Sequence, residues 1–343
     1  MAVLQFSGIA DFVTATQRMF KKTKLVDLMS SLQRHPGVKQ LMRKNRVSIK
    51  SGRACEWEFQ NGTNGSTRFL GLYASPTVNV IDSLGSLTLD WIHVNSNCGF
   101  DQHEADMNSD PARIVDLIKA RHRAMYADWV ETMETAFWTC PASTNTSDPK
   151  GVPYHIVKNN TTGFNGGHAS GYSDWAGKSR TTYTRLKNYT AQYTNISKAD
   201  LVDKMREGAM LIEFHPLVED MPLINAGKEI GIYTCRDVAL PFGSLLEAQN
   251  DNLGNDLASK DGVTTFHRTS VEWVPKLDSD TTDPIYFMHW PSWEMQVLKN
   301  WWMNELVVKG PGDQPRVVNI HLDTSLQIVC FDPRRNAVFA KDV

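Results

Sequence analysis

Residues 53–76 show the clearest alternation of apolar and polar side chains in the chain. The first half alternates Cys55, Trp57 and Phe59 with Glu56 and Glu58, which is the period of a half-exposed strand. Two Asn-Gly pairs follow, and both residue types tolerate a positive φ. A second strand is expected to return through Arg68, Phe69, Leu70 and Leu72. The pattern predicts a long hairpin with a polar tip, each arm reaching about 25 to 35 Å at roughly 3.3 Å per residue. Such a hairpin is marginal alone and needs another surface to lie on.

A helical pattern covers residues 111–138, where apolar residues recur at steps of three and four. Pro111 fits the first helical position, and Asp110 before it is a good N-cap. The predicted apolar stripe consists of Ile114, Ile118, Met125, Trp129, Met133 and Phe137. A helix of about 42 Å would span a whole flat domain, and His122 and Glu134 are expected as polar residues beside the stripe.

The remaining pattern predicts a helical arm, a long loop and an α/β body. Residues 12–33 have helical spacing until His35-Pro36-Gly37 ends it, and residues 140–185 form a long polar loop. Ser197 is placed as the N-cap of the next helix, with Asp200 completing a capping box. A later helix at 245–252 is expected to begin only after Pro241-Phe242-Gly243. The predicted strands lie within 77–94, 229–235, 263–275, 283–290, 316–323, 325–331 and 337–343.

Composition places the chain among ordered proteins, because 41% of its 343 residues are apolar and 22% are charged. No apolar run approaches the roughly 20 residues of a membrane span, and the N-terminus lacks a basic leader, so synthesis in the cytoplasm is expected.

The net charge is −2, yet residues 1–53 contain eleven Lys or Arg against only Asp11 and Asp27. The sequence therefore predicts a basic arm on an acidic body, either as a solvated helix face or as a contact for a polyanion or an acidic neighbouring copy.

Motifs that suggest chemistry stand in contexts that do not support it. Residues 171–180, GYSDWAGKSR, end in Gly-Lys-Ser, but Tyr172 stands where a phosphate-binding loop requires glycine, so a polar surface loop is predicted. His103, Glu104 and Asp106 are expected to be solvated rather than metal ligands. The cysteines form no C-x-x-C pair and are expected as buried or idle thiols: Cys55, Cys98, Cys140, Cys235 and Cys330. Four tryptophans are expected in a core or a subunit contact: Trp290, Trp293, Trp301 and Trp302. No catalytic, cofactor-binding or metal site is predicted.

The order of these parts resembles the major capsid protein of tailed double-stranded DNA bacteriophages, which has the Hong Kong 97-type α+β fold. Two stretches strengthen the resemblance: DPKGVPYHIVKNNTTGFNGGH running on to RLKNYTAQYTNISKADLVDKMR, and LLEAQNDNLGNDLASKDG followed by VEWVPKLDSDTTDPIYFMHW. It covers most of the chain from about residue 45 onward. The domains that the resemblance implies are an N-terminal arm (1–45), an extended loop with flanking strands (46–100), a peripheral domain (101–196) with a spine helix (111–138) and an inserted polar loop (140–185), an axial domain (197–289), a return through the peripheral domain (290–330) and a closing strand (331–343).

The implied function is self-assembly into pentamers and hexamers that form the icosahedral head shell around double-stranded DNA. The hairpin would lie over a neighbouring subunit, and its expected contact residues are Trp57, Phe59, Glu56, Glu58, Arg68 and Phe69. The basic arm would face the genome or a neighbour through Lys21, Lys22, Lys24, Arg43 and Lys44. Residues 309–316 would form the loop where capsomers meet. The implied location is the virion, with assembly in the host cytoplasm.

The other implied partners are a separate scaffolding protein, a portal protein and a decoration protein, with no cofactor and no membrane. Some relatives join a lysine of the extended loop covalently to a neighbour, but residues 60–68 contain no lysine. Reinforcement is therefore expected from packing, decoration proteins, or late disulfides of Cys55 or Cys98. Two alternatives remain open: an encapsulin-like nanocompartment shell around a cargo enzyme, and a hydrolase or sugar-binding protein built on the tryptophan-rich segments.

Overall fold

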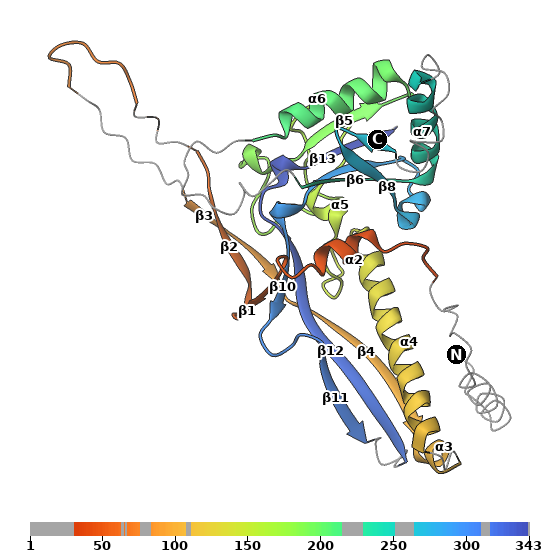
Figure 1. Cartoon of the computed structure of the whole chain (residues 1–343). Helices are drawn as coiled ribbons and strands as arrows, with labels where there is room; N and C mark the ends of the chain where they lie inside the picture. The colour runs from red at the N-terminus through yellow and green to blue at the C-terminus, as the bar shows by residue number, and fades with distance from the viewer. Residues whose placement is uncertain are drawn as a thin grey trace.

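The computed structural model describes residues 31–62, 65, 67–75, 84–107, 111–214, 229–250, 264–309 and 316–341. They build two sheets, one above the other in Figure 1, and a two-stranded hairpin beside them. Helices lie against both sheets, and this mixture of helices and strands confirms the α+β class predicted from the sequence.

The lower, five-stranded sheet is organised around one long strand, β12. This strand pairs with β4 along one edge and with β11 and β10 along the other, and β1 adds parallel to β10. The sequence predicted two strands, 316–323 and 325–331, where the structure has one. The strand continues past Asp323 because its pairing with β4 runs without a break from Val317 to Leu326, and the Asp323 carboxylate accepts a hydrogen bond from the Asn95 amide on β4. The strands are β1 (Val47–Lys50), β4 (Ile92–Asp101), β10 (Trp293–Leu298), β11 (Asn304–Lys309) and β12 (Val317–Cys330).

The long helix α4 (Pro111–Phe137) lies along this sheet, with the short α3 (Gln102–Met107) before it and α2 (Pro36–Leu41) across its C-terminal end (Figure 1). Its predicted start at Pro111 is confirmed. The side chains of the stripe that the structure describes are all buried: Met125, Trp129, Met133 and Phe137. Ile114 and Ile118 are outside the residues whose side chains are described.

The upper, six-stranded sheet has the order β5-β13-β9-β6-β8-β7. Four of its strands come from the range predicted as one domain, 197–289, but β5 and the closing strand β13 pair with each other at its edge. The strands are β5 (Tyr189–Tyr193), β6 (Ile230–Thr234), β7 (Thr265–Phe266), β8 (Thr269–Trp273), β9 (Ile285–His289) and β13 (Ala337–Lys341).

Helices and tight turns connect and cover this sheet. The helices are α5 (Val152–His155), α6 (Asp203–Leu211) and α7 (Arg236–Asn250). A π-helical turn, η2 (Lys198–Val202), leads into α6, and the 3-10 turns are η1 (Thr184–Leu186), η4 (Pro275–Ser279), η5 (Trp290–Ser292) and η6 (Pro333–Arg335).

The structure differs from the predicted helices at two places, the start of the helix after Ser197 and the position of Pro241. Ser197 caps its helix as predicted, since its Oγ accepts from the Asp200 backbone N–H at 3.3 Å. The Asp200 carboxylate instead accepts from the N–H groups of Thr194 (2.8 Å) and Asn195 (2.9 Å), so the capping box is only half formed. Pro241 was expected to precede the next helix, but it lies inside α7. The helix continues through it although proline has no N–H for the backbone hydrogen bond at that position.

The hairpin is real, but its second strand is not the predicted one. The strand β2 (Ala54–Gln60) pairs antiparallel with β3 (Leu84–Asp90), whereas the predicted return at 68–72 belongs to a loop without strand structure. The register places Trp57 opposite Leu87, and a Cβ at Gly85 would lie 2.5 Å from the Phe59 ring. The Asn-Gly pairs indicated a tight turn, but pairing with residues 84–90 buries the apolar face of both strands.

Candidate assembly surfaces

The base of the hairpin is fixed to its own chain by aromatic packing. Trp57 is only 8% exposed, and its ring meets Trp175 and Phe331 edge to face, each with ring centroids 6.2 Å apart. Phe59 packs in the same way on Tyr183, at 5.6 Å. Both residues were predicted to anchor the hairpin on a neighbouring subunit. Trp57 leaves almost no surface for that role, because its contacts lie within the chain.

The loop beneath the hairpin is a packed element and not the polar surface loop that the sequence predicted. Trp175 and Ala176 are buried, and the Ala176 carbonyl accepts from the Thr88 N–H on β3 at 3.1 Å. The Ala176 N–H in turn donates to the Tyr154 hydroxyl at 2.9 Å. This pair of bonds ties β3 to α5 through the stretch that resembled a phosphate-binding loop, which therefore has a structural role.

Arg180 is the last residue of that stretch, and it is fully buried. Its guanidinium donates to the backbone carbonyls of Gly167 and His155, both at 2.7 Å, and lies 4.7 Å from the centre of the Trp175 ring. Burial lowers its pKa to about 10. Among the described residues, no carboxylate forms an ion pair with Arg180, so carbonyl oxygens and an aromatic face stabilise the charge.

His155 is buried at the centre of the same cluster. Its Nδ1 accepts from the Trp175 indole N–H at 3.1 Å, so Nε2 carries the proton and donates to the Ile328 carbonyl at 3.2 Å. Burial, with the nearby Arg180 charge, lowers the pKa of His155 to about 3. The imidazole is therefore neutral and serves as a fixed link between the loop and β12.

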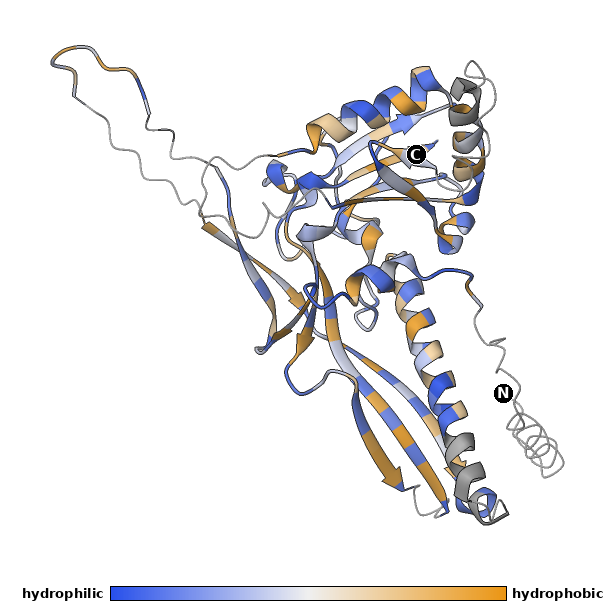
Figure 2. Cartoon of the chain, viewed as in Figure 1, coloured by the Kyte–Doolittle hydropathy of each residue, from blue (hydrophilic) through white to orange (hydrophobic). Residues whose placement is uncertain are grey.

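Beyond its base, the hairpin exposes apolar side chains. The described residues between 67 and 75 are all exposed, and Phe69 (107%), Leu72 (92%) and Tyr73 (102%) are almost entirely in solvent. Arg68 is exposed beside them, and Glu56 and Glu58 form the exposed face of β2. Figure 1 shows this loop far from both sheets, and Figure 2 shows hydrophobic positions along it. Soluble monomers rarely expose clustered apolar side chains of this kind, and within the described residues nothing covers them.

A second exposed apolar surface lies on β11. All six of its residues are exposed, including Leu306 (52%), Val307 (64%) and Val308 (40%). Within the described residues, β11 pairs only with β12, so its other backbone edge is available for pairing. The strand is also tied to α4, because the Glu305 carboxylate on β11 accepts a hydrogen bond from the Tyr126 hydroxyl on α4 at 2.8 Å.

The N-terminal arm joins the body through two carboxylates of α4. Glu131 accepts from Ser31 Oγ at 2.7 Å, and Glu134 accepts from the N–H groups of Gly37 (3.0 Å) and Val38 (2.7 Å). Glu134 was expected as a flanking polar residue, but it is fully buried, and burial raises its pKa. The Trp138 indole N–H, four positions on, also donates to it at 2.7 Å. The two backbone partners are more than ninety positions away, which no local sequence pattern could have indicated.

The predicted basic residues are only partly described. Lys21, Lys22 and Lys24 lie outside the described residues. Arg43 and Lys44 are exposed in the turn after α2, and Arg43 approaches Glu229 at 3.9 Å.

The predicted cysteine chemistry is also constrained by burial. All five cysteines are free thiols, with Cys55, Cys235 and Cys330 buried. Burial raises the pKa of Cys55 to about 12, which leaves little thiolate for the late disulfide considered for it. Cys98 is less buried, and its pKa is also raised.

The described residues contain no group of three His, Cys, Asp or Glu side chains that could hold a metal ion. Of the three residues near the start of α3 that were expected to be solvated, Glu104 pairs with Arg121 at 2.7 Å, and His103 contacts Arg316. Trp290 and Trp293 lie in the core, as one of the two predicted placements had it, and Trp301 is 45% exposed. Among the described helices, none has the length and apolar character to cross a membrane.

Comparison with solved structures shows capsid chains that share this architecture. The cyanophage A-1(L) capsid matches with a TM-score of 0.64 and 15% identity, over 96% of this chain and 99% of that one. The capsid of the empty GTA particle gives 0.55 and 10% identity, over 100% and 99%. The capsid of Myoviridae phage XM1 gives 0.52 and 10%, over 95% and 97%. No protein-family model and no curated protein sequence matches the chain. The chain therefore has the Hong Kong 97-type fold of phage capsid proteins, as the sequence resemblance predicted.

Proposed function

We propose that this chain is the major capsid protein of a tailed bacteriophage. It assembles into pentamers and hexamers, which form an icosahedral shell around the double-stranded DNA genome. The observation that carries the proposal is the match to capsid chains over nearly the full length of both partners. Because a fold by itself can serve several functions, the exposed apolar surfaces supply the second support.

Those two surfaces favour contacts between copies. The loop with Phe69, Leu72 and Tyr73 and the strand β11 lie at opposite ends of the molecule in Figure 1, so one chain cannot cover one with the other. Different patches meeting head to tail are heterologous contacts, which close into rings when the rotation permits. Phe69 is the apolar anchor on the neighbour, and Glu56, Glu58 and Arg68 set the polar register.

The basic arm contacts the packaged genome through Lys21, Lys22, Lys24, Arg43 and Lys44. The exposure of Arg43 and Lys44 supports this role. Such contacts to phosphate carry no sequence preference and weaken with salt, which suits a container for a whole genome. A separate scaffolding protein, a portal protein and a decoration protein complete the head in the host cytoplasm. The role is structural and needs no cofactor.

Electron microscopy of the expressed chain, alone and with a candidate scaffolding protein, tests the proposal. Closed shells of uniform size are expected in at least one condition. A protein that stays monomeric at high concentration in both conditions contradicts it. Native particles should protect double-stranded DNA from nuclease, whereas particles that enclose an enzyme and no DNA would establish a nanocompartment shell instead.

A further inference from the structure

Two short crossings of the chain run between the two sheets and lie next to each other. The strand β9 passes into β10 through the turn η5 (Trp290–Ser292), and β12 passes into β13 through η6 (Pro333–Arg335). In Figure 1 the blue strands run from the upper sheet into the lower sheet at this point. Any rotation of one sheet against the other must bend both crossings.

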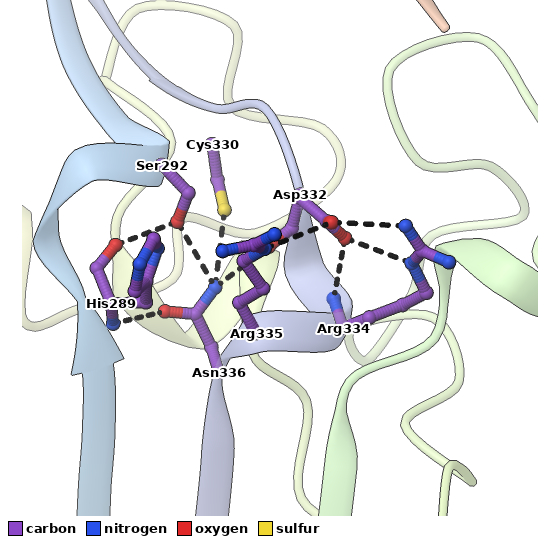
Figure 3. Close-up of polar contacts among 7 residues, drawn as sticks. All are labelled: His289, Ser292, Cys330, Asp332, Arg334, Arg335 and Asn336. Carbon is purple, nitrogen blue, oxygen red and sulfur yellow. Dashed lines mark hydrogen bonds and ion pairs between the residues drawn. The ribbon is translucent and has the colours of Figure 1, made fainter. Parts of the chain in front are cut away.

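The side chain of Asn336 forms hydrogen bonds with both crossings (Figure 3). Its Oδ1 accepts from the His289 N–H at 2.9 Å and from the Trp293 indole N–H at 3.0 Å. Its Nδ2 donates to the Asp332 carbonyl at 3.0 Å. Asn336 is 0% exposed, so water does not replace these bonds when they break.

Other polar contacts support the crossings. Within the first, Ser292 Oγ donates to the His289 carbonyl at 2.7 Å. Between the two, the Phe331 N–H donates to the Ser292 carbonyl at 2.8 Å. In η6 the Asp332 carboxylate accepts from the Arg334 side chain through Nε and Nη2, both at 3.0 Å. One backbone bond therefore joins the crossings, and the Asn336 amide is the side chain that joins them through both an acceptor and a donor.

We propose that Asn336 is the joint that fixes the angle between the two sheets and thereby the curvature of the shell. The inference rests on the proposed shell function. The two sheets carry different outer surfaces, so a change in their angle redirects the contacts that each makes with its neighbours. In a closed assembly of repeated heterologous contacts, a small change per subunit accumulates around each ring and alters the size at which the shell closes.

Asn188 provides a matched control. It is also 0% exposed, and its amide also bridges backbone groups, accepting from the Val157 N–H and donating to the Val157 carbonyl, both at 3.0 Å. These bonds hold the loop before β5 and do not span the two crossings. Asn336→Ala and Asn188→Ala therefore delete the same atoms from two buried sites with different places in the fold.

The first measurement is the size distribution of shells formed by both variants, by cryo-electron microscopy. We expect Asn188→Ala to keep the wild-type diameter and Asn336→Ala to give a broadened or shifted distribution. Equal distributions for the two variants overturn the inference. If the wild-type chain forms no shell, it is the proposed function that fails.

The second measurement covers the case in which Asn336→Ala does not assemble. Amide hydrogen exchange of unassembled subunits should accelerate at His289 by about tenfold, the effect of losing one ordinary buried hydrogen bond. The exchange rate at Val157 should stay unchanged in this variant. Asn188→Ala should instead accelerate exchange at Val157 and leave the rate at His289 unchanged. Unchanged exchange at His289 in Asn336→Ala overturns the joint regardless of assembly.

Discussion

The base and the far loop of the hairpin contain similar residues in opposite environments. At the base, Trp57 and Leu87 are 8% and 0% exposed and belong to a core cluster with Trp175. In the far loop, Phe69 and Tyr73 are completely exposed. Apolar residues at the base thus stabilise the single chain, whereas those in the far loop can contribute only when another molecule covers them. Each such side chain gains about 1.5 to 3 kcal/mol when it is fully buried.

The strongest test of this comparison is Trp57→Ala. Removing the ring leaves a cavity against Trp175 and Phe331, so the free energy of unfolding of the unassembled subunit should fall by about 3 to 5 kcal/mol. Urea unfolding followed by circular dichroism measures it. Phe69→Ala, in the same hairpin, is the control and should leave that free energy within about 0.5 kcal/mol. Equal losses in the two variants would erase the distinction between the base and the loop.

A smaller effect is expected from pH, through His155 beneath the base. Its pKa is lowered from the usual 6.5 to about 3 in the folded chain, so the unfolded chain binds one more proton between these values. The contribution to stability is therefore complete above pH 6.5 and falls by about 1.4 kcal/mol for each pH unit below it. Urea unfolding between pH 5.0 and 7.5 measures the slope.

The control for this slope is a pair of variants. His155→Gln lowers stability at every pH, and its unfolding free energy should no longer show the part of the pH dependence that comes from the buried imidazole. His122→Gln removes a partly exposed imidazole from α4, and its unfolding free energy should keep the pH dependence that comes from His155. A slope that survives in His155→Gln would show that other groups cause the pH dependence.

The local sequence pattern was enough to predict the helices and strands in which buried side chains recur at a regular spacing. The stripe of α4 and the alternation of β2 are visible in the sequence, because every turn of the helix and every second strand residue faces the same core. The partner of β2 was not predictable in this way. The segments 68–72 and 84–90 are both apolar, and only packing on residues 169–186 selects the second.

The burial of several polar residues was also not predicted from the sequence, for a physical reason. Arg180, His155, Glu134 and Asn336 are hydrophilic types, so a sequence pattern places them on a surface, yet each is 0% exposed. Each has at least one hydrogen-bond partner from a segment distant in sequence, such as His289 for Asn336. Only the assembled fold brings these donors and acceptors together. Trp57 and Phe69 were both expected as contact residues, and the sequence does not distinguish them, yet Trp57 is buried within its own chain and Phe69 is exposed.

The smallest effect on the single chain should accompany the largest effect on assembly. Replacing Phe69 and Tyr73 together by serine removes apolar surface that is already in water, so the unfolding free energy should change by less than about 0.5 kcal/mol. If neighbouring copies cover these side chains, the same change removes roughly 3 to 6 kcal/mol from each contact and should raise the protein concentration needed for shell formation by more than a hundredfold. Light scattering against concentration measures that threshold. The control is Thr67→Ser, a small exposed change in the same loop, which should assemble as wild type does. Normal shells from the double variant would mean that the loop is not a contact surface, and the apolar strand β11 would then be the remaining candidate.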